Sequence, residues 1–178
     1  MATKKFLLSA PKWDAKIIQD LQVYLADNLT WLTTAYGKAK TLKMATNEGE
    51  IRYPAVFDTV SGYQSVTPHE ADGNTVFFTC TKSTSESNQG GRFEISAIFF
   101  LKVDEVNTPD YAVDSAILQI LSFPKHGISE KISVYEKFSD VFEGFDLNET
   151  ENFETMHPYH VFKLSFEVIS TTINTDCL

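Results

Sequence analysis

Phe93-Glu-Ile-Ser-Ala-Ile-Phe-Phe-Leu-Lys102 is the stretch of sequence that decides the fold. Its apolar side chains recur at every second position, at Phe93, Ile95, Ala97, Phe99 and Leu101. This is the period of a β-strand that buries one face. Ile98 and Phe100 place apolar side chains on the opposite face as well. The far end of the strand is therefore expected to be covered on both sides.

A second strand is predicted just upstream, over Thr75–Thr81, after the turn signal Asp72-Gly-Asn74. The two strands are expected to form a hairpin whose ten-residue tip, Ser83–Arg92, contains no core residue. Because hairpin loops usually have about two to five residues, a tip of this length points to a contact with another subunit. A loop without a role explains the segment equally well. The candidate contact residues are Ser83, Ser85, Glu86, Asn88, Gly90 and Arg92.

Two amphipathic helices are predicted, one on each side of this hairpin. The first runs from Pro11 to about Asn28, and the second starts at Thr108, a good capping residue, and runs to about Ser122. Each has one apolar face, formed by Ile17, Ile18, Leu21, Tyr24 and Leu25 in the first helix and by Val113, Ala116, Ile117, Ile120 and Leu121 in the second. A helix of this kind buries its apolar face against another element.

The remaining strand patterns complete the predicted fold. Weak or short candidates lie at Leu29–Tyr36, Thr41–Ala45, Ile51–Phe57 and Ile132–Phe138, and a strong alternating one runs from Phe162 to Val168. The element order predicts a single α+β domain over residues 1–178. In this domain two helices pack on one face of a mainly antiparallel, twisted β-sheet with an extended hairpin.

The composition excludes several classes of protein. Hydrophobic residues make up 43% of the 178 residues and include 14 Phe, which is unlike a disordered chain. No stretch reaches the roughly 20 apolar residues of a membrane span, and the early apolar run stops at Leu8, so neither a membrane segment nor an export signal is expected. Cys80 and Cys177 are far apart, which favours free thiols in a cytoplasmic protein over a disulfide framework.

The net charge of −9 is unevenly distributed along the chain. Residues 1–52 carry eight Lys/Arg and five Asp/Glu, whereas residues 53–178 carry seven and nineteen. So acidic a surface repels polyanions, and tight binding of nucleic acid is not expected. A subunit with one mildly basic and one acidic side fits the asymmetry, and simple solubility fits it as well.

Catalytic and metal-binding motifs are missing from the sequence. No phosphate-binding glycine loop and no Gly-x-Ser-x-Gly elbow is present. His157 and His160 have a spacing that suits zinc, but Pro158 between them disfavours a helix, so a turn before the last strand is the better interpretation. The sequence therefore predicts no enzyme, no metal site and no cofactor.

An acidic stretch, residues 140–154, holds six carboxylates and no base. It lacks the residue order of a calcium loop, so a solvated loop or a short extended segment around Phe142 and Phe145 is expected. The predicted acidic surface consists of Asp140, Glu143, Asp146, Glu149 and Glu151.

Six short motifs together resemble a known kind of protein. They are Tyr53-Pro-Ala-Val-Phe57, Gly62-Tyr-Gln-Ser-Val-Thr-Pro68, Gly73-Asn-Thr-Val-Phe-Phe78, Gly91-Arg-Phe-Glu-Ile95, Ile117-Leu-Gln-Ile-Leu121 and Met156-His-Pro-Tyr-His160. In this order the chain resembles a small neck or tail protein of tailed bacteriophages, of the kind encoded in phages and prophages of Bacteroidetes. The element order is also similar to that of tail-terminator and tail-completion proteins.

This resemblance implies a structural subunit of the virion and not an enzyme. The subunit would form a ring with its own copies at or below the head-to-tail junction, against neighbouring neck and tail proteins. DNA would pass nearby without specific binding, and assembly would take place in the cytoplasm of the bacterial host. Two other functions stay open at this point, a binding module for a small ligand or a protein, and a hydrolase that uses His157 or His160.

Overall fold

The computed structural model describes residues 2–46, 49–66, 73–85, 91–102, 109–125, 127–146 and 159–170. Within these ranges nine strands form one mixed sheet with the order β4-β3-β2-β5-β6-β9-β7, in which β1 pairs with β2 and β8 pairs with β9. The strands are β1 Thr3–Lys4, β2 Thr34–Thr46, β3 Gly49–Asp58, β4 Gly62–Ser65, β5 Thr75–Ser85, β6 Gly91–Lys102, β7 Gly127–Ile128, β8 Ser133–Tyr135 and β9 Tyr159–Ser170. The helices are α1 Asp14–Asn28, α2 Pro109–Leu121 and α3 Phe138–Val141.

The strand β6 lies at the centre of the sheet, as its apolar pattern predicts. It pairs antiparallel with β5 on one side and, over its whole length, with β9 on the other. Ile98 and Phe100 are buried on one face, and Phe99 and Leu101 are buried on the other. The expectation that the far end of this strand is covered on both sides is confirmed. The sheet is mainly antiparallel, with parallel pairing between β1 and β2 and between β2 and β5.

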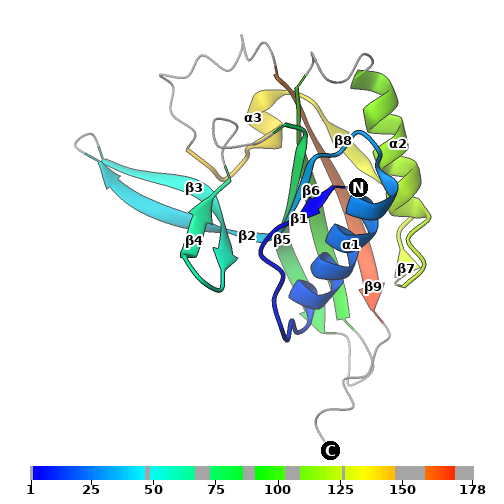
Figure 1. Cartoon of the computed structure of the whole chain (residues 1–178), viewed down its shortest axis with the longest axis horizontal. Coiled ribbons are helices and arrows are strands. Elements are labelled where there is room, and N and C mark those ends of the chain that lie inside the picture. Colours follow the sequence, from blue (N-terminus) through cyan, green and yellow to red (C-terminus); the bar gives the residue numbers. More distant parts are fainter. Residues whose placement is uncertain are drawn as a thin grey trace, which may run out of the picture.

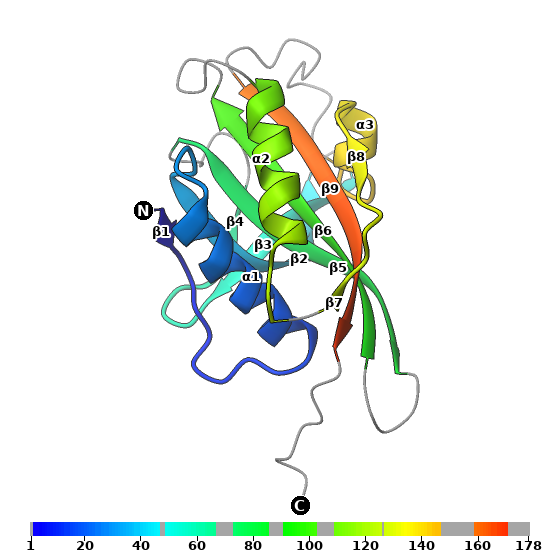
Figure 2. The same ribbon diagram turned by 90° about the vertical axis from the view of Figure 1, so that its right-hand side faces the viewer.

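Helices α1 and α2 cover one face of the sheet (Figure 2). Their apolar residues meet Phe78, Phe99 and Phe162 in the larger core, where the rings of Phe99 and Phe162 stack with centroids 4.6 Å apart. Trp31 closes this layer near α2, because its indole Nε1 donates a hydrogen bond of 2.8 Å to Ser115 Oγ. The α+β fold with two helices on one face is thus present. No helix in the described part of the chain is long and apolar enough to cross a membrane.

A second, smaller core covers the opposite face of the sheet. It contains Phe77 of β5, Phe100 of β6 and Phe142, which follows α3, and the rings of Phe100 and Phe142 stack with centroids 5.6 Å apart. This corrects the expectation of a solvated loop from residue 140 onward. The stretch begins inside the short helix α3, and Val141 and Phe142 are buried in the smaller core. Burying these two apolar side chains is favourable, and the acids beside them can stay in contact with water. Residues 147–154 lie outside the described ranges.

The hairpin of β5 and β6 is longer than the sequence predicts. Ser83 pairs with Phe93, Thr84 with Arg92 and Ser85 with Gly91, so the ladder continues where a ten-residue tip was expected. The polar composition of this end misled the prediction, since backbone pairing needs no apolar side chain. Only residues 86–90 lie between the two strands, and they are outside the described ranges.

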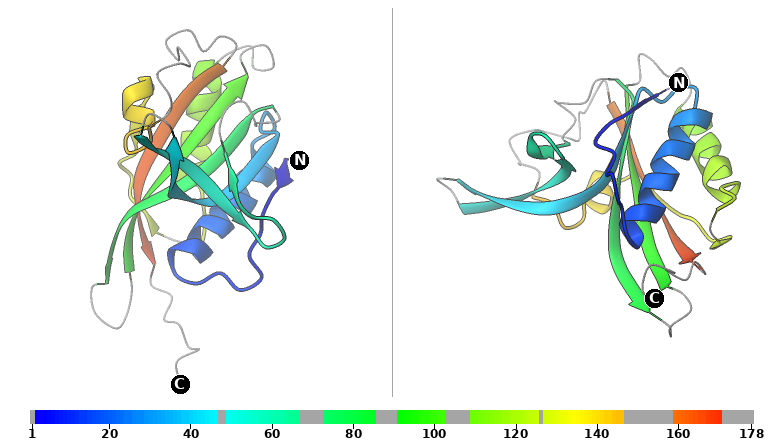
Figure 3. Two further views of the ribbon diagram at one scale, coloured as in Figure 1. Left: turned by 90° about the vertical axis from the view of Figure 1, so that its left-hand side faces the viewer. Right: turned by 60° about the horizontal axis from the view of Figure 1, so that its bottom comes forward.

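The strand β2 runs through Gly37 without a break and changes its pairing partner along its length, whereas two separate weak strands were expected there. Its first part pairs with β5 up to Lys38, and from Ala39 to Thr46 it pairs with β3. Because β2 bends away from β5 at this point, β2, β3 and β4 project from the rest of the molecule, on the side away from α2 (Figures 1 and 3). We call residues 39–46, 49–58 and 62–65 the arm.

Candidate functional site

The arm has two faces with different surroundings. Strand pairing places Ala39 opposite Val56, Leu42 opposite Tyr53, and Met44 opposite Ile51. Since side chains alternate across a strand and opposed residues share a face, Ala39 and Val56 point to one side. Leu42, Met44, Ile51 and Tyr53 point to the other. We call the first the inner face and the second the outer face.

The inner face is anchored to the rest of the protein. Ala39 and Val56 are buried in the smaller core. Arg52 forms a bidentate ion pair with Asp146, which follows α3 in the chain. Arg52 Nε and Nη2 donate to the carboxylate at 2.8 and 2.7 Å, and Asp146 N donates to Arg52 O at 2.7 Å. The hydrogen bond from Arg52 holds the pKa of Asp146 below its ordinary value, and the same contact raises the pKa of Arg52.

The outer face is apolar and open to solvent. Met44 is 49% exposed, Phe57 41% and Tyr63 40%. Phe57 and Tyr63 are opposed on β3 and β4, and their rings meet edge to face with centroids 5.3 Å apart. Lys40 Nζ lies 5.8 Å from the Tyr63 ring centroid, within reach of a cation–π interaction. Exposed apolar side chains gathered on one face mark an interaction site in a soluble protein.

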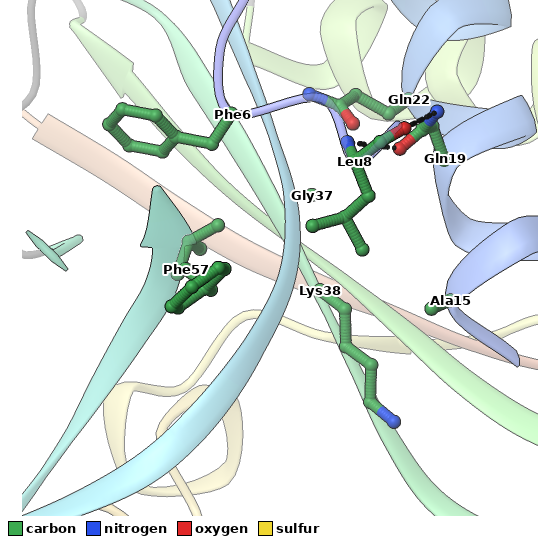
Figure 4. A pocket seen from close by; sticks show the side chains of 9 residues that line it. Phe6, Leu8, Ala15, Gln19, Gln22, Gly37, Lys38 and Phe57 are labelled. Atoms are coloured by element: carbon green, nitrogen blue, oxygen red, sulfur yellow. Dashed lines mark hydrogen bonds between the residues drawn. The ribbon is translucent and has the colours of Figure 1, made fainter. Parts of the chain in front are cut away.

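The root of the arm is fixed to α1 by a buried glutamine. Gln22 Nε2 donates to the carbonyls of Lys5 and Ala35, both at 2.8 Å, and Gln22 Oε1 is buried without a partner among the described residues. Beside it, Gln19 and Leu8 exchange two hydrogen bonds (Figure 4). The cavity at this point measures about 30 Å³, which suits one or two waters and excludes a small organic ligand.

More exposed apolar side chains adjoin the root of the arm. Leu8 and Phe57 line the same small cavity together with Ala15 of α1, so the outer face meets the N-terminal segment there (Figure 4). Leu7 and Trp13 in this segment are exposed, and Trp13 has a φ of 52°, a conformation that bulky residues rarely adopt. We call the surface formed by Leu7, Trp13, Phe57 and Tyr63 the corner; Met44 lies on the same face but six residues further along the arm, because it pairs with Ile51.

Three of the six residues expected to contact another subunit lie in strands and not on a loop. Ser83 and Ser85 belong to β5 and Arg92 belongs to β6, where Arg92 Nη1 donates to Glu167 of β9 at 3.0 Å. Glu86, Asn88 and Gly90 lie outside the described ranges, so their role stays a prediction.

The predicted acidic surface is only partly described. Asp140 and Glu143 are exposed, Asp146 is paired with Arg52, and Glu149 and Glu151 lie outside the described ranges. A base from elsewhere also reaches this region, because Lys163 Nζ donates to the Asp140 carbonyl and lies 4.5 Å from the Tyr135 ring centroid. Burial lowers the pKa of Lys163, and the nearby Glu143 and Asp140 oppose that shift.

No catalytic or metal-binding cluster is found among the described residues. His160 Nε2 lies 3.7 Å from Glu136 Oε1, and the described part of the chain has no group of three or more His, Cys, Asp or Glu side chains that could hold a metal ion. His157 lies outside the described ranges. A groove of about 390 Å³ beside β8 and β9 is lined by charged and hydroxyl side chains, but its Arg92 is already paired with Glu167.

Sequence reasoning missed the arm as a functional surface. The signal was present in two short alternating runs, Leu42-Lys-Met-Ala45 and Ile51-Arg-Tyr-Pro54, on either side of the turn Asn47-Glu-Gly49. This is the pattern of a hairpin with one apolar face. What the pattern does not say is that this face stays uncovered.

Comparison with known proteins gives no further guide to this site. No protein-family model matches the sequence, no curated protein is similar to it, and no solved structure matches its fold.

Proposed function

We propose that this protein is a structural subunit of a phage neck or tail, which forms a ring with its own copies at or below the head-to-tail junction around the DNA channel. The observation that carries the proposal is the outer face of the arm. Met44, Phe57 and Tyr63 are exposed on the same face of an element that projects from the fold. These side chains do not stabilise a monomer, because an exposed apolar side chain contributes none of the favourable free energy of burial.

The charge distribution and the sequence motifs support the same proposal. The acidic balance of residues 53–178 suits a wall past which DNA moves without sticking, and Asp140 and Glu143 are exposed to contribute to it. The Tyr53-Pro-Ala-Val-Phe57 motif, on which the resemblance to neck and tail proteins partly depends, forms half of β3 in the arm. The proposed role is structural, with no reaction and no cofactor.

Native mass spectrometry and negative-stain electron microscopy test the proposal. The purified protein is measured alone and together with the neck and tail proteins of the same phage. A closed multimer or a place in a larger ring is expected. A chain that stays monomeric in every one of these mixtures contradicts the proposal.

A further inference from the structure

Helix α2 carries a second exposed apolar surface, far from the arm. Its residues Asp110, Tyr111, Asp114, Leu118 and Leu121 are all exposed, with Tyr111 at 63% and Leu118 at 62%. At about 100° per residue they fall within roughly 100° of arc on the helix. A helix packed on a sheet normally turns polar residues to solvent, so this apolar stripe is unusual. We call these five residues the α2 stripe.

We propose that the α2 stripe of one copy docks into the corner of the next copy. This pairing rests on the proposed function, because it assumes that copies associate, and it names the two surfaces that meet.

The shapes of the two surfaces favour this pairing. The stripe is the outer side of a helix and is convex, whereas the corner lies where the root of the arm meets the start of α1, since Phe57 and Ala15 line the same small cavity. A helix laid against a sheet with aromatic side chains is a common way to bury an apolar stripe. Trp13, Phe57 and Tyr63 supply large aromatic surfaces of the kind that dominate binding energy at interfaces.

The charges of the two surfaces are opposite. The helix α2 holds Asp110 and Asp114 and no base, and the corner is flanked by the exposed Lys12 and Lys40. Opposite charges at the rim of an interface fix its register and speed association. Two copies of the stripe facing each other would instead bring four carboxylates together.

The positions of the two surfaces favour a closed or open array over a simple dimer. The arm and α2 lie on opposite sides of the molecule (Figure 1). A contact between two different surfaces is head-to-tail, and repeating it produces a ring when the rotation closes. The ring of the proposed function requires a contact of this type.

Two variants that each destroy one surface test the pairing. Trp13→Asp alters the corner and Leu118→Asp alters the stripe. Each is expected to weaken self-association roughly tenfold or more, because a central apolar contact is lost. Val134→Asp, at an exposed apolar residue of β8 outside both surfaces, is the matched control and should assemble like the wild type. Melting temperatures of all three should stay close to that of the wild type.

Mixing the two variants gives the decisive measurement. The intact stripe of the Trp13→Asp variant should bind the intact corner of the Leu118→Asp variant, and native mass spectrometry should find a one-to-one complex and nothing larger. A mixture that stays monomeric while the wild type assembles overturns the pairing and leaves the proposed function standing. A wild type that assembles only with other neck or tail proteins likewise overturns the pairing of identical copies.

A charge exchange sharpens the result further. Lys40→Asp and Asp114→Lys should each weaken self-association, and the double variant should regain most of it if the two residues face each other across the interface. If the double variant associates more weakly than either single variant, Lys40 and Asp114 do not face each other, and the proposed register of the interface is wrong.

Discussion

The strands β6 and β3 show how differently two apolar strands are used in this molecule. Phe99 and Phe100 of β6 are buried on opposite faces because a layer of helices covers one side and the smaller core covers the other. Val56 of β3 is buried in the smaller core, but its neighbour Phe57 points to the outer face, where the described chain covers its ring only in part and leaves it 41% exposed. The same alternation thus builds a core in the body of the protein and an interaction surface in the arm. The neighbours of a strand decide which of the two it becomes.

The comparison predicts its largest effect in the body. Phe162→Ala removes a fully buried ring that stacks on Phe99, and it should lower the free energy of unfolding by about 3–5 kcal/mol. For a chain of this size that is a fall in Tm of roughly 10 °C. Met44→Ala in the arm is the matched change and should cost no more than about 0.5 kcal/mol. Thermal denaturation measures the loss of stability in each variant. If the two variants lose equal stability, the arm is packed as tightly as the body and the distinction between them is wrong.

The root of the arm should give an intermediate effect. Gln22→Ala removes the hydrogen bonds to Lys5 O and Ala35 O, each of which contributes about 0.5–1.5 kcal/mol, while Ala35 O keeps the hydrogen bond from Lys5 N. Gln19→Ala, on the same helix and only half-buried, serves as the control and should cost less. Hydrogen exchange should also show faster opening of residues 34–38 in the Gln22 variant. If hydrogen exchange of residues 34–38 is unchanged in this variant, Gln22 does not stabilise the attachment of the arm.

The contact between the arm and the segment after α3 should give a smaller effect that depends on pH. The folded-state pKa of Asp146 is lowered by Arg52, so the pair contributes stability above the ordinary pKa of an aspartate and loses it as the pH falls through the folded value. Asp146→Asn should therefore be less stable than the wild type at neutral pH, and the two Tm values should converge in acid. Because the pair is exposed, high salt should also reduce the difference. If the difference in Tm between Asp146→Asn and the wild type persists unchanged at low pH, the charge of Asp146 is not its cause.

The smallest effect on stability is expected at the end of the β5–β6 hairpin. Replacing residues 86–90 by Asn-Gly keeps the pairing of Ser85 with Gly91 and should leave Tm nearly unchanged. If these residues touch a neighbouring subunit, as the sequence suggests, assembly measured by native mass spectrometry should fail in this variant. Normal assembly would assign the subunit contact to the arm and α2 instead.

Much of the fold was predictable from local patterns. The helix α1 follows from the spacing of Ile17, Leu21 and Leu25, and α2 follows from the pattern between Pro109 and Leu121. The alternating strands β6 and β9 were equally clear, because period-two burial leaves a direct trace in the order of residues. The hairpin tip was predicted too long, since Ser83 and Arg92 pair through the backbone and polar side chains carry no signal of that.

What the sequence by itself determined is which residues are apolar and at what period they recur. That information sets the helices, the central strands and the charge of the two ends of the chain. Only the tertiary structure decided that Phe142 is buried beside Phe100, that Asp146 meets Arg52, and that Phe57 and Leu118 remain exposed. The physical reason is that burial is a property of pairs of distant segments, and here those pairs form when β2 leaves β5 after Lys38 and carries the arm away from the helices.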